Sequence, residues 1–349
     1  LHQKFIPLLL MKKIIYYLLL FSLIIGTFGA YTIYSKVFAV IVGQETTIFI
    51  QEESNYAELL EKLQDKGIVK DEKVFDLLAT KMNLKNKIRP GKYVFQKGTN
   101  YINVIRDLRS GKQTAVKLVI NNINFKNDLA EKISKQLDID STSLLRFLND
   151  ERELKKFGFN KDNIMCQFIP NTYQVYWTTD QIGFVQKMIK EHDSFWTNSR
   201  KTKAKALNLT VDEVFILASI VEKEYKYADE RTRIAGVYLN RLNIKMPLQA
   251  DPTCKFAWGD LSLKRVLNIH TQNPHPYNTY YINGLPPGPI CLPETSTIDA
   301  VLNAEKHKYL YFCAHADLNG RHDFNKNLSA HNASARKYQR ALNKLKIYK

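Results

Sequence analysis

The longest apolar stretch of the chain lies close to its start. Residues 14–34 read IIYYLLLFSLIIGTFGAYTIY and contain no charged side chain over 21 positions. A helix of about 20 apolar residues spans the hydrocarbon core of a bilayer, so this pattern predicts a transmembrane anchor. Lys12 and Lys13 precede the stretch. By the positive-inside rule they place the N-terminus in the cytoplasm and the rest of the chain outside it.

A cleaved signal peptide is the alternative interpretation of the same stretch. Signal peptides have a shorter apolar core and a small-x-small cleavage site. Cleavage after Ala30 would put the large Phe28 at the third position back, whereas cleavage after Gly29 is permissible. The length of the stretch favours a single anchor, with its cytoplasmic start, over residues 11–35. Residues 1–10 precede Met11 and its two lysines, and we expect them to be an upstream extension.

The pattern between residues 46 and 112 predicts a small separate module. Leu59, Leu60 and Leu63 recur on one side of a helix. Gly111 follows the last predicted helix, as a C-terminal stop signal does. The predicted elements are a strand over 47–50, helices over 56–63 and 73–82, a turn and strand over 89–95, and a helix over 103–108.

Residues 117–349 are expected to form a second, larger domain. The chain of 349 residues has room for about two domains. Strands and helices both occur in this part, so the expected fold class is α+β throughout the exported chain. The predicted elements are a strand over 117–122 and helices over 126–137, 141–148 and 184–198.

One helix of the larger domain combines a strong start signal with an apolar interior. Thr210-Val211-Asp212-Glu213 is a capping box, and residues 214–221 are apolar apart from Ser219. Such a helix should be buried on all sides. Glu222 and Glu224 follow at its end. Burial disfavours a charged carboxylate and raises its pKa, which would make either residue a candidate general acid.

Periodicity does not choose between these two carboxylates, because residues two apart point about 200° apart around a helix. Both side chains could also simply mark the place where the helix reaches water.

Charge and cysteine content narrow the functional classes. The formal net charge is +17, which suits an anionic polymer or membrane surface as well as nucleic acid. The lysines and arginines are dispersed, with short clusters such as residues 200–205, and the sequence has no zinc-finger, basic-zipper or RNP-like motif. We expect these clusters to be solvated. Cysteines at 166, 254, 291 and 313 form no Cys-x-x-Cys pair, so we expect no metal site. We expect isolated core residues, and the alternative in an exported domain is one disulfide bridge.

A set of short motifs in fixed order resembles the endolytic murein transglycosylases of the YceG-like family. The resemblance covers most of residues 45–345. Its motifs are Ile169-Pro170-Asn171-Thr172-Tyr173, Leu217 to Glu224, Asn240-Arg241-Leu242, Leu248 to Thr253, Tyr277 to Tyr280, Gly284 to Ile290, Tyr309 to Phe312, His322-Asp323-Phe324-Asn325 and His331-Asn332. Asn171 stands where some relatives are expected to have an acidic residue, which weakens a catalytic role there.

The resemblance implies an enzyme that cleaves the bond between N-acetylmuramic acid and N-acetylglucosamine without water and leaves 1,6-anhydro ends. Glu222 matches the first glutamate of the family's Glu-Lys-Glu and is expected to be catalytic; Glu224 would support it. Asp251 is the second choice of catalytic carboxylate. His331 is more often structural in such a position than a direct contact. Expected substrate contacts are Glu224, Gln249, Asp251, Thr253, Tyr277, Asn278, Tyr280, Phe324 and Asn332.

The resemblance also implies the surroundings of the enzyme. Residues 46–112 are expected to be a LysM-like domain that contacts glycan, and no cofactor or metal is expected. The expected partners are peptidoglycan glycan strands, the cytoplasmic membrane and nearby peptidoglycan synthases, the penicillin-binding proteins, with no nucleic acid. Strand cleavage would then limit strand elongation. The alternative is a membrane-anchored peptidoglycan-binding protein without catalysis.

Overall fold

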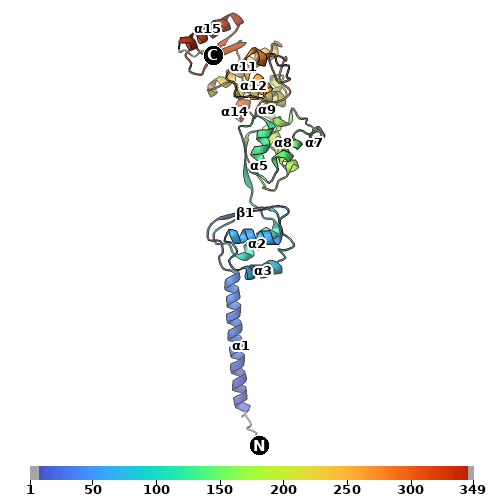
Figure 1. The fold of residues 1–349 in the computed structure, drawn as a ribbon, viewed down its shortest axis with the longest axis vertical. Coiled ribbons are helices and arrows are strands. Elements are labelled where there is room, and N and C mark those ends of the chain that lie inside the picture. The colour runs from blue at the N-terminus through green and yellow to red at the C-terminus, as the bar shows by residue number, and fades with distance from the viewer. Residues whose placement is uncertain (1–7, 345–349) are drawn as a thin grey trace. The chain divides into compact units, whose positions relative to one another are not determined.

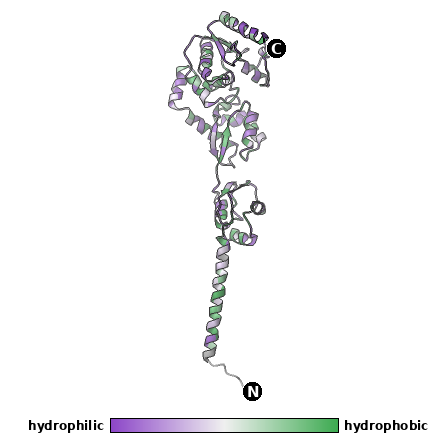
Figure 2. Ribbon diagram, turned by 90° about the vertical axis from the view of Figure 1, so that its left-hand side faces the viewer, coloured by the Kyte–Doolittle hydropathy of each residue, from purple (hydrophilic) through white to green (hydrophobic). Residues whose placement is uncertain are grey.

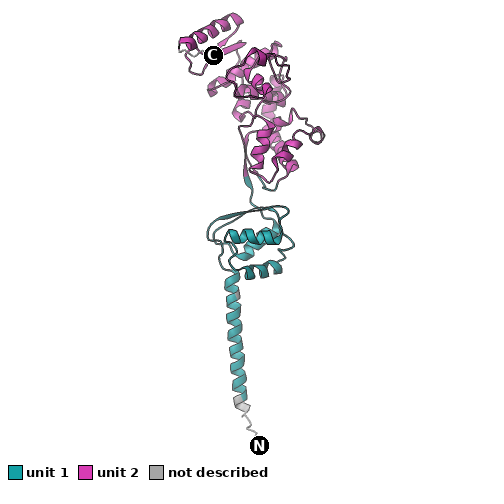
Figure 3. Cartoon of the chain, in the orientation of Figure 1, with its two compact units in different colours: residues 1–116, 175–178 teal, residues 117–174, 179–349 magenta. Residues whose placement is uncertain are grey.

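A computed structural model describes residues 8–344, so most of the predicted extension over residues 1–10 lies outside the described residues. The described chain forms two compact units, residues up to 116 with 175–178, and residues 117–174 with 179–349 (Figure 3). Each unit is described by itself. Both contain helices and short two-stranded sheets, so the fold is mixed α+β (Figure 1).

The first unit begins with one long apolar helix. Helix α1 covers Leu8–Val37, and its segment Met11–Val37 has a stretch of mean hydropathy 1.9 with none of it buried (Figure 2). This segment is long and apolar enough to cross a membrane, as the sequence predicts. A signal sequence would satisfy the same test of length and composition.

The rest of the first unit is a small module with its own core. Its elements are β1 (Thr46–Ile50), α2 (Tyr56–Asp65), α3 (Glu72–Lys81), β2 (Gly91–Phe95) and α4 (Tyr101–Ser110). Strands β1 and β2 pair antiparallel, with Thr46 opposite Phe95 and Ile50 opposite Gly91. Leu59, Phe75 and Val104 are fully buried between the helices and the sheet. Gly111 ends α4 with φ at 74°, the left-handed conformation that glycine adopts without a steric penalty.

The second unit is mostly helical. Its elements before the central helix are β3 (Val116–Ile120, whose first residue belongs to the first unit), α5 (Lys126–Ser134), α6 (Ser141–Phe147), α7 (Glu151–Lys155), η1 (Ile164–Gln167), β4 (Asn171–Val175, whose last residue belongs to the first unit), α8 (Gln181–Phe195) and α9 (Asn198–Ala206). Strand β3 pairs with β4. The basic cluster at 200–205 lies on α9, and Arg200 donates two hydrogen bonds of 2.9 Å to Asp299. Part of that cluster therefore attaches α9 to a neighbouring helix rather than facing only water.

The central helix α10 (Val211–Glu222) is the predicted buried helix, and its capping box is confirmed. The Thr210 hydroxyl accepts a hydrogen bond from the Glu213 N–H at 3.2 Å, and the Glu213 carboxylate accepts one from the Thr210 N–H at 2.7 Å. Every residue from Val214 to Val221 is buried. The buried Ser219 hydroxyl is hydrogen-bonded: it donates to the Ile216 carbonyl and accepts from the Ile290 N–H.

The remaining elements pack around α10 and carry the candidate site. They are η2 (Ala228–Glu230), α11 (Arg231–Asn243), α12 (Asp251–Trp258), α13 (Asn268–Thr271), α14 (Thr295–Leu302), β5 (Tyr311–Ala314), β6 (His322–Asn325) and α15 (Leu328–Lys344). Helices α11 and α14 pack against α10. Strands β5 and β6 form an antiparallel hairpin, with Tyr311 opposite Asn325, and α15 packs on that hairpin.

Candidate active site

Glu222, the last residue of α10, is engaged by its neighbours. Its Oε2 accepts hydrogen bonds from the Thr297 hydroxyl and from the Glu294 N–H, the latter at 3.3 Å. Its Oε1 accepts a hydrogen bond of 3.2 Å from the Tyr225 hydroxyl. Because Glu294 and Thr297 lie at the start of α14, the Glu222 carboxylate joins the end of α10 to the start of α14. Among the described residues that line the cavity discussed next, Glu222 does not occur.

Glu224 lies two residues beyond the helix and lines a cavity of about 340 Å³. The Tyr238 hydroxyl donates a hydrogen bond of 2.6 Å to its Oε1. Burial raises the pKa of Glu224 to about 7, and the negative charge of Asp251 acts in the same direction. The hydrogen bond from Tyr238 and the charges of Lys255 and Arg241 oppose this shift. Near neutral pH the carboxyl group is thus partly protonated, which is the state a general acid needs.

The cavity is enclosed by segments that are far apart in the sequence. Helix α11 contributes one face, the segment around the start of α12 a second, and the β5–β6 hairpin with α15 a third. The lining residues besides Glu224 are Tyr238, Arg241, Leu248, Gln249, Asp251, Tyr280, Phe312, Cys313, Ala314, His322 and His331.

Arg241 connects two of these walls through backbone carbonyls. Its guanidinium donates to the Leu310 carbonyl at 2.6 Å, just before β5, and to the Leu248 carbonyl at 2.8 Å, just before α12. It also lies over the Tyr311 ring at 5.1 Å. Burial lowers the pKa of Arg241. Since arginine stays charged in proteins, this side chain places a fixed positive charge near Glu224.

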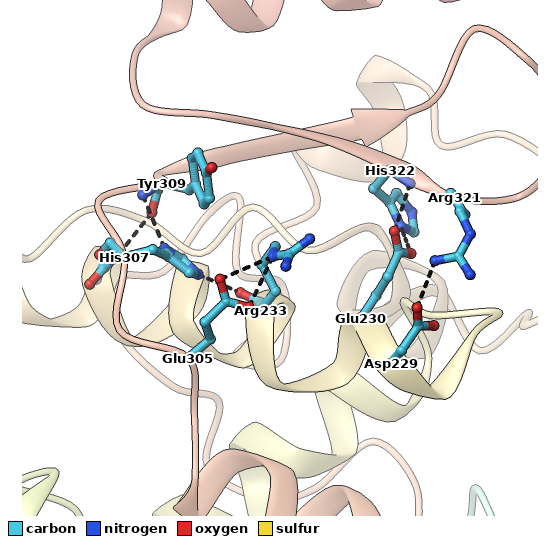
Figure 4. A network of polar contacts seen from close by, with 9 residues as sticks. Asp229, Glu230, Arg233, Glu305, His307, Tyr309, Arg321 and His322 are labelled. Carbon is cyan, nitrogen blue, oxygen red and sulfur yellow. Dashed lines mark hydrogen bonds and ion pairs between the residues drawn. The ribbon is translucent and has the colours of Figure 1, made fainter.

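The polar network drawn in Figure 4 holds the chain leading into the hairpin on α11. Arg233 forms an ion pair of 3.0 Å with Glu305, and His307 Nε2 lies 2.9 Å from the Arg233 carbonyl. The Asn240 amide donates to the carbonyls of His307 and Tyr309, both at 2.9 Å. These contacts fix the position of the hairpin wall relative to Tyr238 and Arg241.

Of the predicted substrate contacts, Asp251, Tyr280 and Gln249 line the cavity. The Tyr280 hydroxyl donates a hydrogen bond of 2.7 Å to the Asp251 carboxylate. Burial, with the nearby charge of Asp251, raises the pKa of Tyr280. Helix α12 begins at Asp251, and Pro252 occupies its first turn. Proline fits there because the first N–H groups of a helix have no partner within the helix.

Thr253 and Asn278, also expected to contact substrate, are fully buried and line no part of this cavity as described. The Thr253 hydroxyl donates to the Ala250 carbonyl at 2.6 Å and lies 2.8 Å from the Thr279 hydroxyl. The Asn278 amide donates to three backbone carbonyls, at His270, Thr271 and Asn273. Both side chains therefore hold the loops that carry Gln249, Asp251 and Tyr280.

Three further expected contacts also lie outside the described lining. Tyr277 packs against the Phe256 ring at 4.9 Å, and Phe324 of β6 packs against Phe312 at 6.0 Å. Asn332 is exposed on α15. Its neighbour His331 does line the cavity and stacks on Tyr311 at 5.4 Å. Burial, with the charge of Arg241, lowers the pKa of His331, which favours a neutral imidazole.

Sequence reasoning assigned no site role to Tyr238, Arg241, His322 or the β5 residues of the wall. Tyr238 and Arg241 are three apart, so they share one face of α11, and that spacing was the available signal. Cys313 is partly exposed in the wall, unlike the other three cysteines, and all four are free thiols. No group of three or more His, Cys, Asp or Glu side chains within residues 8–344 is arranged to hold a metal ion.

Comparison with known proteins agrees with this architecture. The sequence profile of the YceG-like family matches residues 48–337. An endolytic murein transglycosylase of Bacillus subtilis is 30% identical over 79% of this chain and 80% of its own length. One of Streptococcus pneumoniae is 27% identical over 82% of this chain, which spans 58% of that relative. A crystal structure of a putative yceG-like protein from Listeria monocytogenes is 26% identical, with a TM-score of 0.55 over 83% of this chain and 98% of its own. The profile match alone covers well over half of the sequence, so the chain belongs to the YceG-like family.

Proposed function

We propose that this protein is an endolytic peptidoglycan lytic transglycosylase that cleaves the bond between N-acetylmuramic acid and N-acetylglucosamine and leaves 1,6-anhydro ends. Family membership and the names of the relatives support the reaction class. The observation that carries the proposal is the Glu224 carboxyl group, which lines a cavity and has a pKa of about 7. Its place in the cavity and its protonation near neutral pH together make it a candidate general acid.

Glu224 is the better candidate for the general acid than Glu222. A general acid must reach the substrate oxygen and hold a proton near working pH. Glu224 meets both conditions, whereas the Glu222 carboxylate is occupied by Thr297, Glu294 and Tyr225. The roles expected from the family motif are therefore exchanged in this proposal, with Glu222 acting as the support.

The proposed reaction needs no water and no metal. Glu224 gives its proton to the leaving oxygen as the bond from that oxygen to C1 of the muramic acid breaks. The C6 hydroxyl of the same sugar attacks C1, and its proton passes to a base; the ionised Glu224 can take that part in turn. Because the nucleophile belongs to the substrate, much of the entropy cost of bringing the reactants together is avoided.

A hydrolase is the second candidate, because Asp251 lines the same cavity as Glu224. Ordinary glycosidases use two carboxylates in this way, one as acid and one as base or nucleophile. Product analysis on purified, uncrosslinked glycan strands separates the two reactions. We expect fragments that end in 1,6-anhydro-muramic acid. Fragments with reducing ends would support the hydrolase, and no fragments at all would support the non-catalytic alternative.

The first unit is proposed to anchor the enzyme and to contact glycan as a LysM-like module. The strand–helix–helix–strand order of β1 to β2 and the separate core support an independent module. A pocket on this module is lined by Phe49 and Trp177, whose rings lie 5.0 Å apart, and by Lys62 and Lys66. Aromatic rings beside positive charges suit sugars that carry carboxylates.

Helix α1 would place everything after it outside the cytoplasm, where the enzyme could cut strands near the synthases that make them and so limit strand elongation. The basic charge would suit both the acidic stem peptides of peptidoglycan and the anionic membrane surface. We expect a reporter fused after Lys349 to be active only on the outer side of the cytoplasmic membrane. Activity in the cytoplasm would contradict this topology.

A further inference from the structure

We propose that Glu230 and His322 form a dyad that makes His322 the general base of the cavity, working opposite Glu224. The inference deepens the proposed transglycosylase function and rests on it. It assigns the proton of the attacking C6 hydroxyl to a second residue, so that Glu224 need not act as acid and base in turn.

The two side chains are joined in a fixed geometry. His322 Nδ1 lies 2.9 Å from Glu230 Oε2, and the His322 backbone N–H donates to Glu230 Oε1 at 3.1 Å (Figure 4). Glu230 is 4% exposed at the start of α11. His322, the first residue of β6, lines the cavity. The dyad thus runs from the buried edge of the unit to the surface that a substrate would meet.

The hydrogen bond determines the tautomer of the imidazole. An ionised carboxylate only accepts hydrogen bonds, so Nδ1 must carry the proton that lies between it and Glu230. A neutral imidazole with Nδ1–H has its lone pair on Nε2. That nitrogen is then an acceptor, and when it takes a proton the positive charge forms next to the Glu230 carboxylate. A histidine oriented by a buried carboxylate is a recurrent arrangement for proton transfer in enzymes.

Aromatic side chains limit the rotation of the ring. The Phe312 ring lies 5.3 Å from the His322 ring at 87°, and the Phe324 ring lies 6.2 Å away at 67°. With Glu230 on the third side, a ring flip would break the Nδ1 hydrogen bond and meet both phenylalanines. His322 is therefore oriented before any substrate arrives, which is what efficient proton transfer requires.

Charged and titratable groups on neighbouring elements surround the dyad. Arg321 forms an ion pair of 2.8 Å with Asp229 beside Glu230 and adds positive charge at its outer side. The other titratable or charged groups lining the cavity are Glu224, Asp251, Arg241, Cys313, His331, Tyr238 and Tyr280. Different neighbours hold the two groups of the proposed reaction: Tyr238 contacts the proton donor Glu224, and Glu230 contacts the proton acceptor His322.

The proposed step balances without any further reactant. The O6–H proton passes to His322 Nε2 while O6 forms its bond to C1. The bond from C1 to the leaving oxygen breaks, and that oxygen takes the proton of Glu224. The enzyme ends with an ionised Glu224 and a protonated His322, and transfer of one proton between them through solvent restores the starting state.

The test replaces His322 with Asn, whose amide nitrogen can keep the bond to Glu230 while Nε2 is lost. Positioned acid–base groups contribute about 10²–10⁴ in rate, so His322→Asn should lower kcat by about a hundredfold or more with little change in KM. In both proteins the rate should fall with rising pH as Glu224 ionises. A rate of His322→Asn within a few-fold of wild type would overturn the dyad.

Two further measurements keep the test independent of folding and of the reaction class. Glu230→Gln should lower kcat less than His322→Asn does, and His315→Asn, on the same hairpin but outside the described lining, should leave it unchanged. Nitrogen-15 spectra of the imidazole groups in the wild type should show neutral His322 with its proton on Nδ1. A proton on Nε2 instead would refute the dyad even if the transglycosylase reaction is established, and the Glu224 variant described below tests that reaction separately.

Discussion

Glu224→Gln is expected to abolish strand cleavage, whereas Glu222→Gln should keep most of it. Glutamine preserves the size of either side chain but cannot deliver a proton. Loss of a general acid lowers rates by about 10²–10⁴. Glu222 instead accepts three hydrogen bonds, of which the two from Glu294 and Thr297 join α10 to α14. The measurement is the release of anhydro-ended fragments from purified glycan strands, with circular dichroism to verify that both variants fold.

The two substitutions should change the stability of the folded protein in opposite directions. Glu222→Gln replaces one carboxylate oxygen, which accepts hydrogen bonds, with an amide NH2 group that cannot accept them, and a hydrogen bond contributes about 0.5–1.5 kcal/mol. Its denaturant midpoint should fall. If Glu222→Gln lost cleavage with an unchanged midpoint while Glu224→Gln stayed active, the catalytic role would return to Glu222.

The raised pKa of Glu224 should make the folded protein less stable as the pH rises. Its pKa is raised from 4.5 to about 7 in the folded protein, so the folded state binds more protons than the unfolded state between those values. The resulting stabilisation is fully present below pH 4.5 and is lost as pH rises through about 7. Cleavage should decline over the upper part of that range. Glu224→Gln cannot ionise, so at pH 8 it should melt above the wild type. A lower melting temperature there would contradict the burial of this charge.

Gly236→Ala is expected to destabilise the second unit and weaken cleavage together. Gly236 lies in α11, and an added Cβ would stand 2.5 Å from the Glu305 carbonyl oxygen and 2.6 Å from His307 Nε2. Backbone at that distance must move, and overpacking of this kind costs about 1–3 kcal/mol or more. The movement would separate α11 from the segment leading into β5, so the cavity would lose its geometry between Tyr238 and the hairpin.

Chemical denaturation and kcat/KM measure the two consequences of Gly236→Ala. Gly43→Ala is the matched control, because no atom lies within 4 Å of its added Cβ. Surface changes of that kind stay within about 0.5 kcal/mol. Equal stability of the two variants would show that the close approach at Gly236 relaxes without cost.

Local signals in the sequence predicted much of the secondary structure around the site. The capping box at Thr210 and Glu213 and the apolar run after it contain their own start signal and burial pattern, so α10 was predictable from one segment. The ion pair of Arg200, in the basic cluster at 200–205, was not predictable, because its partner Asp299 lies 99 residues away. A solvated basic face and an ion pair between two helices have the same sequence pattern.

The choice between Glu222 and Glu224 shows the same limit more sharply. Helix periodicity separates their directions but does not say which direction is a cavity. Which carboxylate faces the cavity depends on residues far away in the sequence. The Thr297 hydroxyl donates a hydrogen bond to Glu222, and the Tyr238 hydroxyl, on another helix, donates one to Glu224. The burial of Thr253 and Asn278 was equally invisible, since a polar residue in a loop motif suits a scaffold as well as a ligand contact.

Helix α15 supplies His331 to the cavity although none of its residues is fully buried. Segments with little buried apolar surface open at a lower free energy than the whole domain unfolds. We therefore expect the wall to which α15 belongs to open at a lower free energy than α10, whose interior positions are all buried. If the proposed substrate, a long glycan strand without a free end nearby, enters the cavity from the side, the flank formed by α15 is where we expect it to enter.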